Sequence, residues 1–222
     1  MSTIKSNVWD RGGSDVMSRS AFYFVIGIIL AWGFVLTSII AKLTGTWEPR
    51  LFGFLLIGLA LPLCGILLSH CSGNAFVSFI GFNMVVGGIA AIIGPLLLKY
   101  HVDQPGLVER AATMTALVAA TMSVTGLLFP KFYASIGGAL FGALTALVVV
   151  SFVRIFIPAL QGVGIIDYIS AGIFSLYIGY DMWRASEIGA TLDNAVDVAV
   201  ALYLDIINLF LDLLRIMSKA KD

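Results

Sequence analysis

Seven apolar stretches take up most of this 222-residue chain. At a rise of about 1.5 Å per residue, a helix of such a length covers the ~30 Å hydrocarbon core of a lipid bilayer. Because a chain that crosses a bilayer has to satisfy its own backbone hydrogen bonds, each stretch is expected to be a helix. The stretches are residues 21–43, 51–69, 75–98, 111–129, 132–153, 165–183 and 194–217.

These stretches predict an all-α integral membrane protein built as a seven-transmembrane-helix bundle. A single domain is expected over residues 21–217, between a polar N-terminal tail (1–20) and a short C-terminal tail (218–222). The composition agrees, because 59% of the residues are hydrophobic, only 12% are charged and the mean hydropathy is +1.00. Soluble domains are far more polar, so the lipid bilayer is the first expected partner.

Charge and motif content exclude several classes of function. Thirteen basic and thirteen acidic residues balance, so no nucleic-acid partner is expected. The sequence has no glycine-rich phosphate loop and no Cys/His metal pattern, and its two histidines, His70 and His101, lie at segment ends. We therefore expect no enzymatic activity and no cofactor. Gly138 and Gly142 have GxxxG spacing, which indicates helix packing within the chain more than a dimer face, so a monomer is expected rather than an oligomer.

The last stretch carries Asp197, Asp205 and Asp212 on an apolar background. A helix advances by about 100° per residue, which places these residues and Asn208 within roughly one third of its circumference. An ionised group at the centre of a bilayer costs ~2.5 kcal/mol or more, so this face should point to protein or trapped water. We expect the function of the chain to lie along this face.

The last two stretches are expected to form an antiparallel helical hairpin. Gly189 is suited to a left-handed helix C-cap, and Thr191 or Asp193 to the next N-cap. Neither polar face can meet lipid cheaply, so the simplest packing turns Asp181 toward Asp205. Two carboxylates in contact should then share one proton. The three aspartates also leave open a last helix that is short or re-entrant.

Pro62 lies inside the second apolar stretch. Because proline removes a backbone hydrogen bond, the helix is expected to kink there. Such a kink acts either as a hinge or as a fixed bend that neighbouring helices satisfy.

The hairpin also carries a recognisable signature. The residues FSLYIGYD (174–181) and ALYLDIINLFLDLLRI (201–216) closely resemble the end of the transmembrane Bax inhibitor motif family, and the chain looks like a bacterial member. The resemblance implies a seven-helix protein of the bacterial inner membrane that leaks calcium in a pH-dependent way. By motif match, Asp181 and Asp205 would form the hydrogen-bonded pair that senses protons, closes the pore and holds calcium transiently.

The family resemblance also implies a role for His70. Bacterial relatives place an arginine near the end of the second helix, where it engages the aspartate pair. The corresponding stretch here, LLSHCSGNAF, offers only His70 as a basic candidate. Either this histidine performs a related, more pH-dependent task, or it is an interfacial side chain in solvent.

Two functions from different classes follow. The leading expectation is a proton-regulated passive leak for calcium, a hard cation that prefers several oxygen ligands. Weaker candidates for its path are Asp197, Asn208 and Asp212, because the two aspartates lie near helix ends where solvent reaches them. In the alternative, the chain is a regulatory protein that binds other membrane proteins, such as a membrane-bound AAA protease, and its aspartates only hold helices together.

Overall fold

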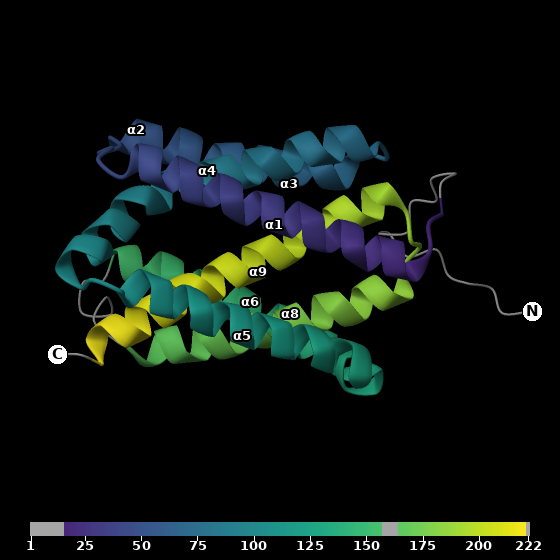
Figure 1. Cartoon of the computed structure of the whole chain (residues 1–222). Helices are drawn as coiled ribbons and strands as arrows, with labels where there is room; N and C mark the ends of the chain where they lie inside the picture. Colours follow the sequence, from purple (N-terminus) through teal and green to yellow (C-terminus); the bar gives the residue numbers. More distant parts are fainter. Residues whose placement is uncertain (1–15, 157–163, 221–222) are drawn as a thin grey trace, which may run out of the picture. The chain divides into compact units, whose positions relative to one another are not determined.

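The computed structural model describes residues 16–156 and 164–220. Of the predicted tails, residues 1–15 and 221–222 lie outside this part of the chain. Within it all regular elements are helices, as Figure 1 shows. They are α1 (Arg19–Thr44), α2 (Leu51–Gly53), the π-helix η1 (Phe54–Ala60), α3 (Leu61–Cys71), α4 (Ala75–Asp103), α5 (Leu107–Leu128), α6 (Pro130–Phe156), α8 (Ile165–Glu187) and α9 (Leu192–Lys219).

The predicted all-α membrane fold is confirmed. Among the described residues, five helical stretches are long and apolar enough to cross a membrane. They are Arg19–Thr44, Leu51–Cys71, Ala75–Asp103, Leu107–Leu128 and Pro130–Ser151. The sixth and seventh predicted segments are helices of 23 and 28 residues, α8 and α9, which hold the aspartates. Whether α9 spans the bilayer or re-enters stays a prediction.

The chain forms two compact units, which are described separately. Unit 1 comprises residues 1–103 and 187–203, and unit 2 comprises residues 104–186 and 204–222. The α9 helix is therefore shared, because its residues up to Tyr203 belong to unit 1 and those from Leu204 to unit 2. The expectation of a single domain over 21–217 stays a prediction.

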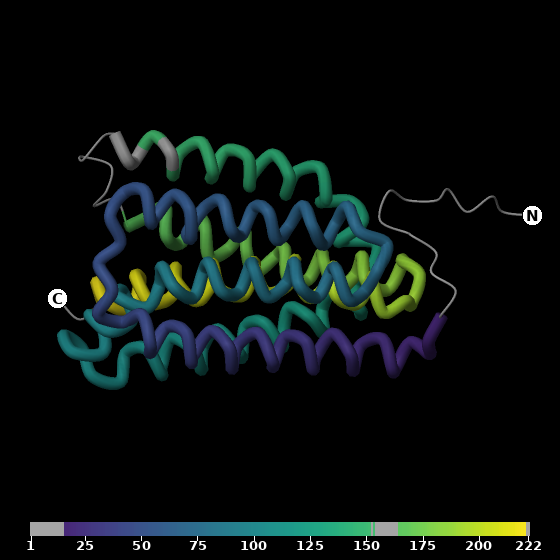
Figure 2. Tube along the Cα trace, turned by 90° about the horizontal axis from the view of Figure 1, so that it is seen from above, coloured from purple at the N-terminus to yellow at the C-terminus, as the bar shows by residue number. Residues whose placement is uncertain are grey.

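In unit 1, α4 packs against α1, α3 and η1, and Figure 2 shows α4 running along these helices. Glycines permit the close approach: a Cβ added to Gly65 would lie 2.5 Å from the carbonyl oxygen of Gly81. Small residues at such crossings let helix backbones approach in a membrane, where the hydrophobic effect gives no driving force between helices.

The irregularity expected near Pro62 is the π-helix η1, which ends two residues before it. Proline has no N–H to donate to the carbonyl of the residue four positions earlier, so the regular α-helical ladder cannot continue through this point. Pro62 is buried, and its ring would lie 2.6 Å from a Cβ added to Gly88. Its function as a hinge stays a prediction.

In unit 2, α8 is held by close contacts with α5 and α6. A Cβ on Gly179 would collide with the ring of Tyr133, and one on Gly126 would collide with the Gly179 backbone. The hydroxyl groups of Tyr133 and Thr125 are 2.8 Å apart, which fixes the ring. Gly179 precedes Asp181 by two residues, so this packing positions the candidate site.

The loop between α8 and α9 differs in one detail from the prediction. Of the two predicted N-caps, Thr191 and Asp193, it is Thr191 whose hydroxyl accepts a hydrogen bond from the N–H of Asn194 at 3.2 Å. However, Gly106 is the only described residue with a positive φ, so Gly189 does not adopt the expected left-handed C-cap. The Asn194 side chain instead donates to the Gly189 carbonyl at 2.7 Å, which satisfies this end of α8 without a left-handed turn.

Candidate functional site

An aspartate pair lies between α8 and α9 in unit 2. Asp181 and Asp205 are 5% and 8% exposed, and their carboxyl groups lie close enough to interact through their charges. The expected juxtaposition of the two side chains is therefore present. That they share one proton, and that they gate a pore, stays a prediction.

Arg184 supplies the nearest positive charge to this pair. Its Nη1 atom is 3.6 Å from Oδ1 of Asp181, one helical turn earlier in α8, and its charge also reaches Asp205. Tyr177, which precedes Asp181 by four residues on α8, interacts electrostatically with both carboxyl groups. The sequence analysis did not identify Arg184 as a partner of the pair, although a spacing of three residues on a helix is a usable signal.

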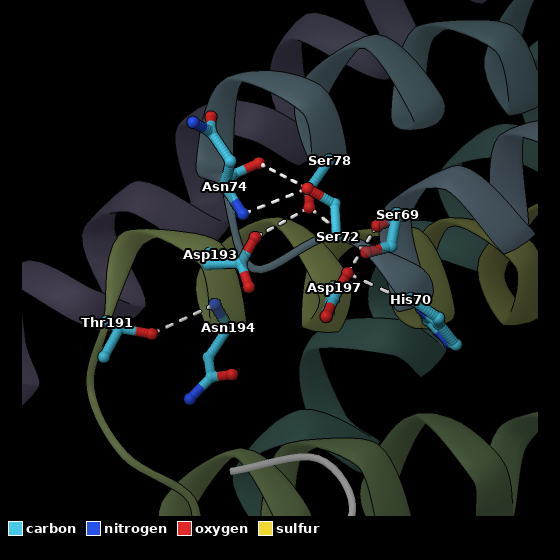
Figure 3. A network of polar contacts seen from close by, with 9 residues as sticks. All are labelled: Ser69, His70, Ser72, Asn74, Ser78, Thr191, Asp193, Asn194 and Asp197. Carbon is cyan, nitrogen blue, oxygen red and sulfur yellow. Dashed lines mark hydrogen bonds and ion pairs between the residues drawn. The ribbon is translucent and has the colours of Figure 1, made fainter. Parts of the chain in front are cut away.

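His70 lies in a polar network of unit 1, drawn in Figure 3. Its Nδ1 atom is 3.5 Å from Oδ1 of Asp197, and Ser69 donates a hydrogen bond to the same carboxylate. Ser78 on α4 donates to Oδ1 of Asp193 at 2.7 Å. The ends of α3, α4 and α9 are thus joined by carboxylates and hydroxyls, and the structure brings together the predicted residues His70 and Asp197.

The remaining predicted residues take different surroundings. Asn208 donates to the carbonyl of Leu204 at 2.7 Å on its own helix, α9. Asp212 is buried, accepts a hydrogen bond from Ser170 and pairs with Arg215. Both residues belong to unit 2, as the aspartate pair does, and their part in an ion path stays a prediction.

Carboxylates are the candidate ligands for a cation at these positions. The described residues contain no group of three or more His, Cys, Asp or Glu side chains that could hold a metal ion. The Asp181–Asp205 pair offers two carboxyl groups, and Oδ2 of Asp205 is buried without a hydrogen-bond partner in the described part of the chain. A hard cation that met this pair would complete its shell with other oxygens.

Comparison with known proteins identifies the family to which the chain is similar. The family described as "Inhibitor of apoptosis-promoting Bax1" matches residues 14–222. An uncharacterized protein of Helicobacter pylori strain J99 is 34% identical over 148 residues, which are 67% of this chain and 60% of that protein. A BI1-like protein of Arabidopsis thaliana is 40% identical over 90 residues, covering 40% of this chain and 35% of the relative.

A third relative is named as a membrane protein. This uncharacterized membrane protein of Streptococcus pyogenes serotype M3 is 35% identical over 119 residues, 50% of this chain and 52% of its own length. The chain thus spans no more than about three fifths of these relatives. The family match, in contrast, extends over nearly the whole sequence and includes both aspartates. The chain is therefore a multi-pass membrane protein that belongs to the Bax inhibitor family.

Proposed function

We propose that this protein is a passive cation leak, chiefly for calcium, that protons regulate through Asp181 and Asp205 in the bacterial inner membrane. The observation that carries the proposal is the buried carboxyl pair of α8 and α9, whose two groups lie close enough to interact. Ionisable groups inside membrane helices are costly and commonly mark ion paths or proton relays.

The shared proton closes the leak. One proton between two carboxyls gives an O–H···O⁻ hydrogen bond, which is short and strong and holds α8 to α9. Loss of this proton leaves two anions in contact, and a second proton removes the charged bond. Either change therefore loosens the contact between the two helices. At high pH, a calcium ion that binds between the two carboxylates stabilises the open form, which ties permeation to gating.

Arg184 balances the charge of the closed pair. With one shared proton the pair carries one negative charge, and the guanidinium near Asp181 neutralises it. Loss of the proton leaves an excess negative charge, which a permeating cation then compensates. Oδ2 of Asp205, which has no hydrogen-bond partner among the described residues, supplies an oxygen for this cation.

His70 adds a separate contact that responds to protons. Its Nδ1 atom lies 3.5 Å from Oδ1 of Asp197 and so joins α3 to α9 within unit 1. An imidazole that binds a second proton becomes positively charged, which strengthens its contact with a carboxylate.

The direct test is calcium flux into sealed proteoliposomes between pH 5 and 8, a range set around the ordinary histidine value of ~6.5. We expect Asp205→Asn to lose the pH dependence, because an amide keeps the side-chain volume but cannot share the proton. The matched control is Asp103→Asn, the same change at an exposed carboxylate at the end of α4. If Asp205→Asn keeps the wild-type profile, the pair is not the sensor. Absence of flux from folded wild-type protein would favour the alternative, a regulatory partner of other membrane proteins.

A further inference from the structure

A second charged cluster joins the first turn of α8 to the last two turns of α9 in unit 2. Oδ2 of Asp167 is 2.9 Å from Nζ of Lys219, and Oδ1 of Asp167 is 3.3 Å from Nε of Arg215. Arg215 also pairs with Asp212, which accepts a hydrogen bond from Ser170. Two carboxylates and two cations thus form one continuous network.

The two signs of charge in this network differ in their exposure. Asp167 and Asp212 are each 1% exposed, whereas the side chains of Arg215 and Lys219 are 39% and 45% exposed. A lysine near a helix end ordinarily extends its ammonium group into water. Lys219 instead turns it toward a buried carboxylate. A buried carboxylate is stable only when paired, so each cation neutralises a group that would otherwise need another partner.

This cluster continues the row of polar residues that contains the aspartate pair. Residues seven apart on a helix lie on nearly the same face, about 10 Å apart along its axis. Asp205, Asp212 and Lys219 follow this spacing on α9. Each of the three has a polar partner on α8. The partners follow one another in the opposite direction along the sequence, as expected for two antiparallel helices. The three levels are Asp205 with Asp181, Asp212 with Ser170, and Lys219 with Asp167.

We propose that Lys219, together with Arg215, is a second gate of this cation path, closed by charge rather than by a shared proton. The inference rests on the proposed leak function. A cation that follows the row of oxygens from Asp205 reaches carboxylates that the protein's own cations already occupy. Opening requires the half-exposed Lys219 side chain to swing into solvent, after which Oδ2 of Asp167 can accept the permeating ion while Oδ1 still faces Arg215.

Because ordinary lysine and arginine side chains stay charged from pH 5 to 8, this gate should act equally across that range. Lys219→Gln removes the ammonium group and keeps a polar side chain. We expect calcium flux into proteoliposomes to rise about fivefold at every pH, the factor typical of losing one partly exposed ion pair. Lys219→Arg keeps the charge and should remain close to wild type.

Two further variants separate charge from structure. Asp167→Asn combined with Lys219→Gln leaves two neutral amides, so no vacated carboxylate draws a cation and the flux should return toward the wild-type level. A charge swap of the two positions is unsuitable, because Arg215 would then face a new lysine. Lys131→Gln, at an exposed lysine at the start of α6, is the matched control and should change nothing.

The outcomes distinguish this gate from the proposed function itself. Wild-type protein without flux refutes the leak and the gate with it, whereas wild-type flux that Lys219→Gln leaves unchanged refutes the gate alone. A double variant as leaky as Lys219→Gln also refutes it, since the charge of Asp167 would then be irrelevant.

If Lys219→Gln does not fold, Lys219→Cys is prepared with Cys64 and Cys71, both exposed, changed to serine. The new cysteine is modified in the assembled membrane. A positively charged thiol reagent should lower the flux and a negatively charged one should not. Equal effects of the two reagents would overturn the proposal.

Discussion

Replacing Arg184 with glutamine tests whether the guanidinium tunes the proton affinity of the aspartate pair. Arg184 favours every state in which the pair carries negative charge, because its Nη1 atom is 3.6 Å from Asp181. Without this cation the pair holds its protons more strongly. The flux that opens on proton loss should therefore begin at higher pH in Arg184→Gln than in the wild type.

The size of the shift follows from the distance and the exposure. At 3.6 Å and an effective dielectric constant of ~20, two unit charges attract by about 5 kcal/mol. This value is an upper bound, because the Arg184 side chain is 22% exposed and water and ions screen it. If about 30% of the attraction survives, the difference is near 1.4 kcal/mol, a factor of ten in proton affinity. The midpoint of the flux profile should move up by about one pH unit.

The assay is calcium flux into proteoliposomes, with the internal and external pH set equal and varied together. Arg184→Lys keeps a cation near Asp181 and should shift the midpoint by less. Arg110→Gln, the same charge change at an exposed arginine in α5, should not shift it. Tyr177 also interacts with both carboxyls, so Tyr177→Phe is measured alongside to identify its contribution. An unchanged midpoint in folded Arg184→Gln, or a shift to lower pH, would refute the electrostatic reasoning.

Two other predictions follow from the packing and from His70. Gly179→Ala should lower the free energy of unfolding of the detergent-solubilised protein by about 1–3 kcal/mol, because the added Cβ collides with Tyr133. The matched control is Gly138→Ala, which should be neutral because an added Cβ there meets no neighbouring described atom within 4 Å. His70→Ala should alter the pH dependence of calcium flux, because the contact between the imidazole and Asp197 strengthens when the imidazole binds a proton. A profile that matches wild type from pH 5 to 8 would leave His70 as a neutral interfacial residue.

The helices and the aspartate pair could be predicted because each rests on local sequence. Long apolar stretches fix the helices, and the cost of exposing a carboxylate to lipid decides which way Asp181 and Asp205 face. Both arguments need only the order of residues along one or two adjacent segments. The approach of these two side chains could be predicted without knowledge of the rest of the chain.

Partners from distant segments could not be predicted in this way. The contact between His70 and Asp197 depends on where the end of α3 meets α9, which no local pattern encodes. Family resemblance suggested that His70 would engage Asp181 and Asp205, whereas its charged partner in unit 1 is Asp197. Lys219 was likewise assigned only to the short C-terminal tail, because a lysine at the end of a helix normally indicates the membrane surface rather than a buried ion pair.

The π-helix η1 has a consequence for the phase of the helix that contains it. A π-turn holds one more residue than an α-turn, so side chains that precede it are rotated by roughly 100° from where a continuous α-helix would place them. Residues 51–53 therefore face a different direction from the one that a helical wheel drawn from α3 assigns to them. Ile57 and Gly58 within η1 still contact α4. The π-helix thus takes up the equivalent of one extra residue. The residues before it are rotated, but its own residues still pack against α4.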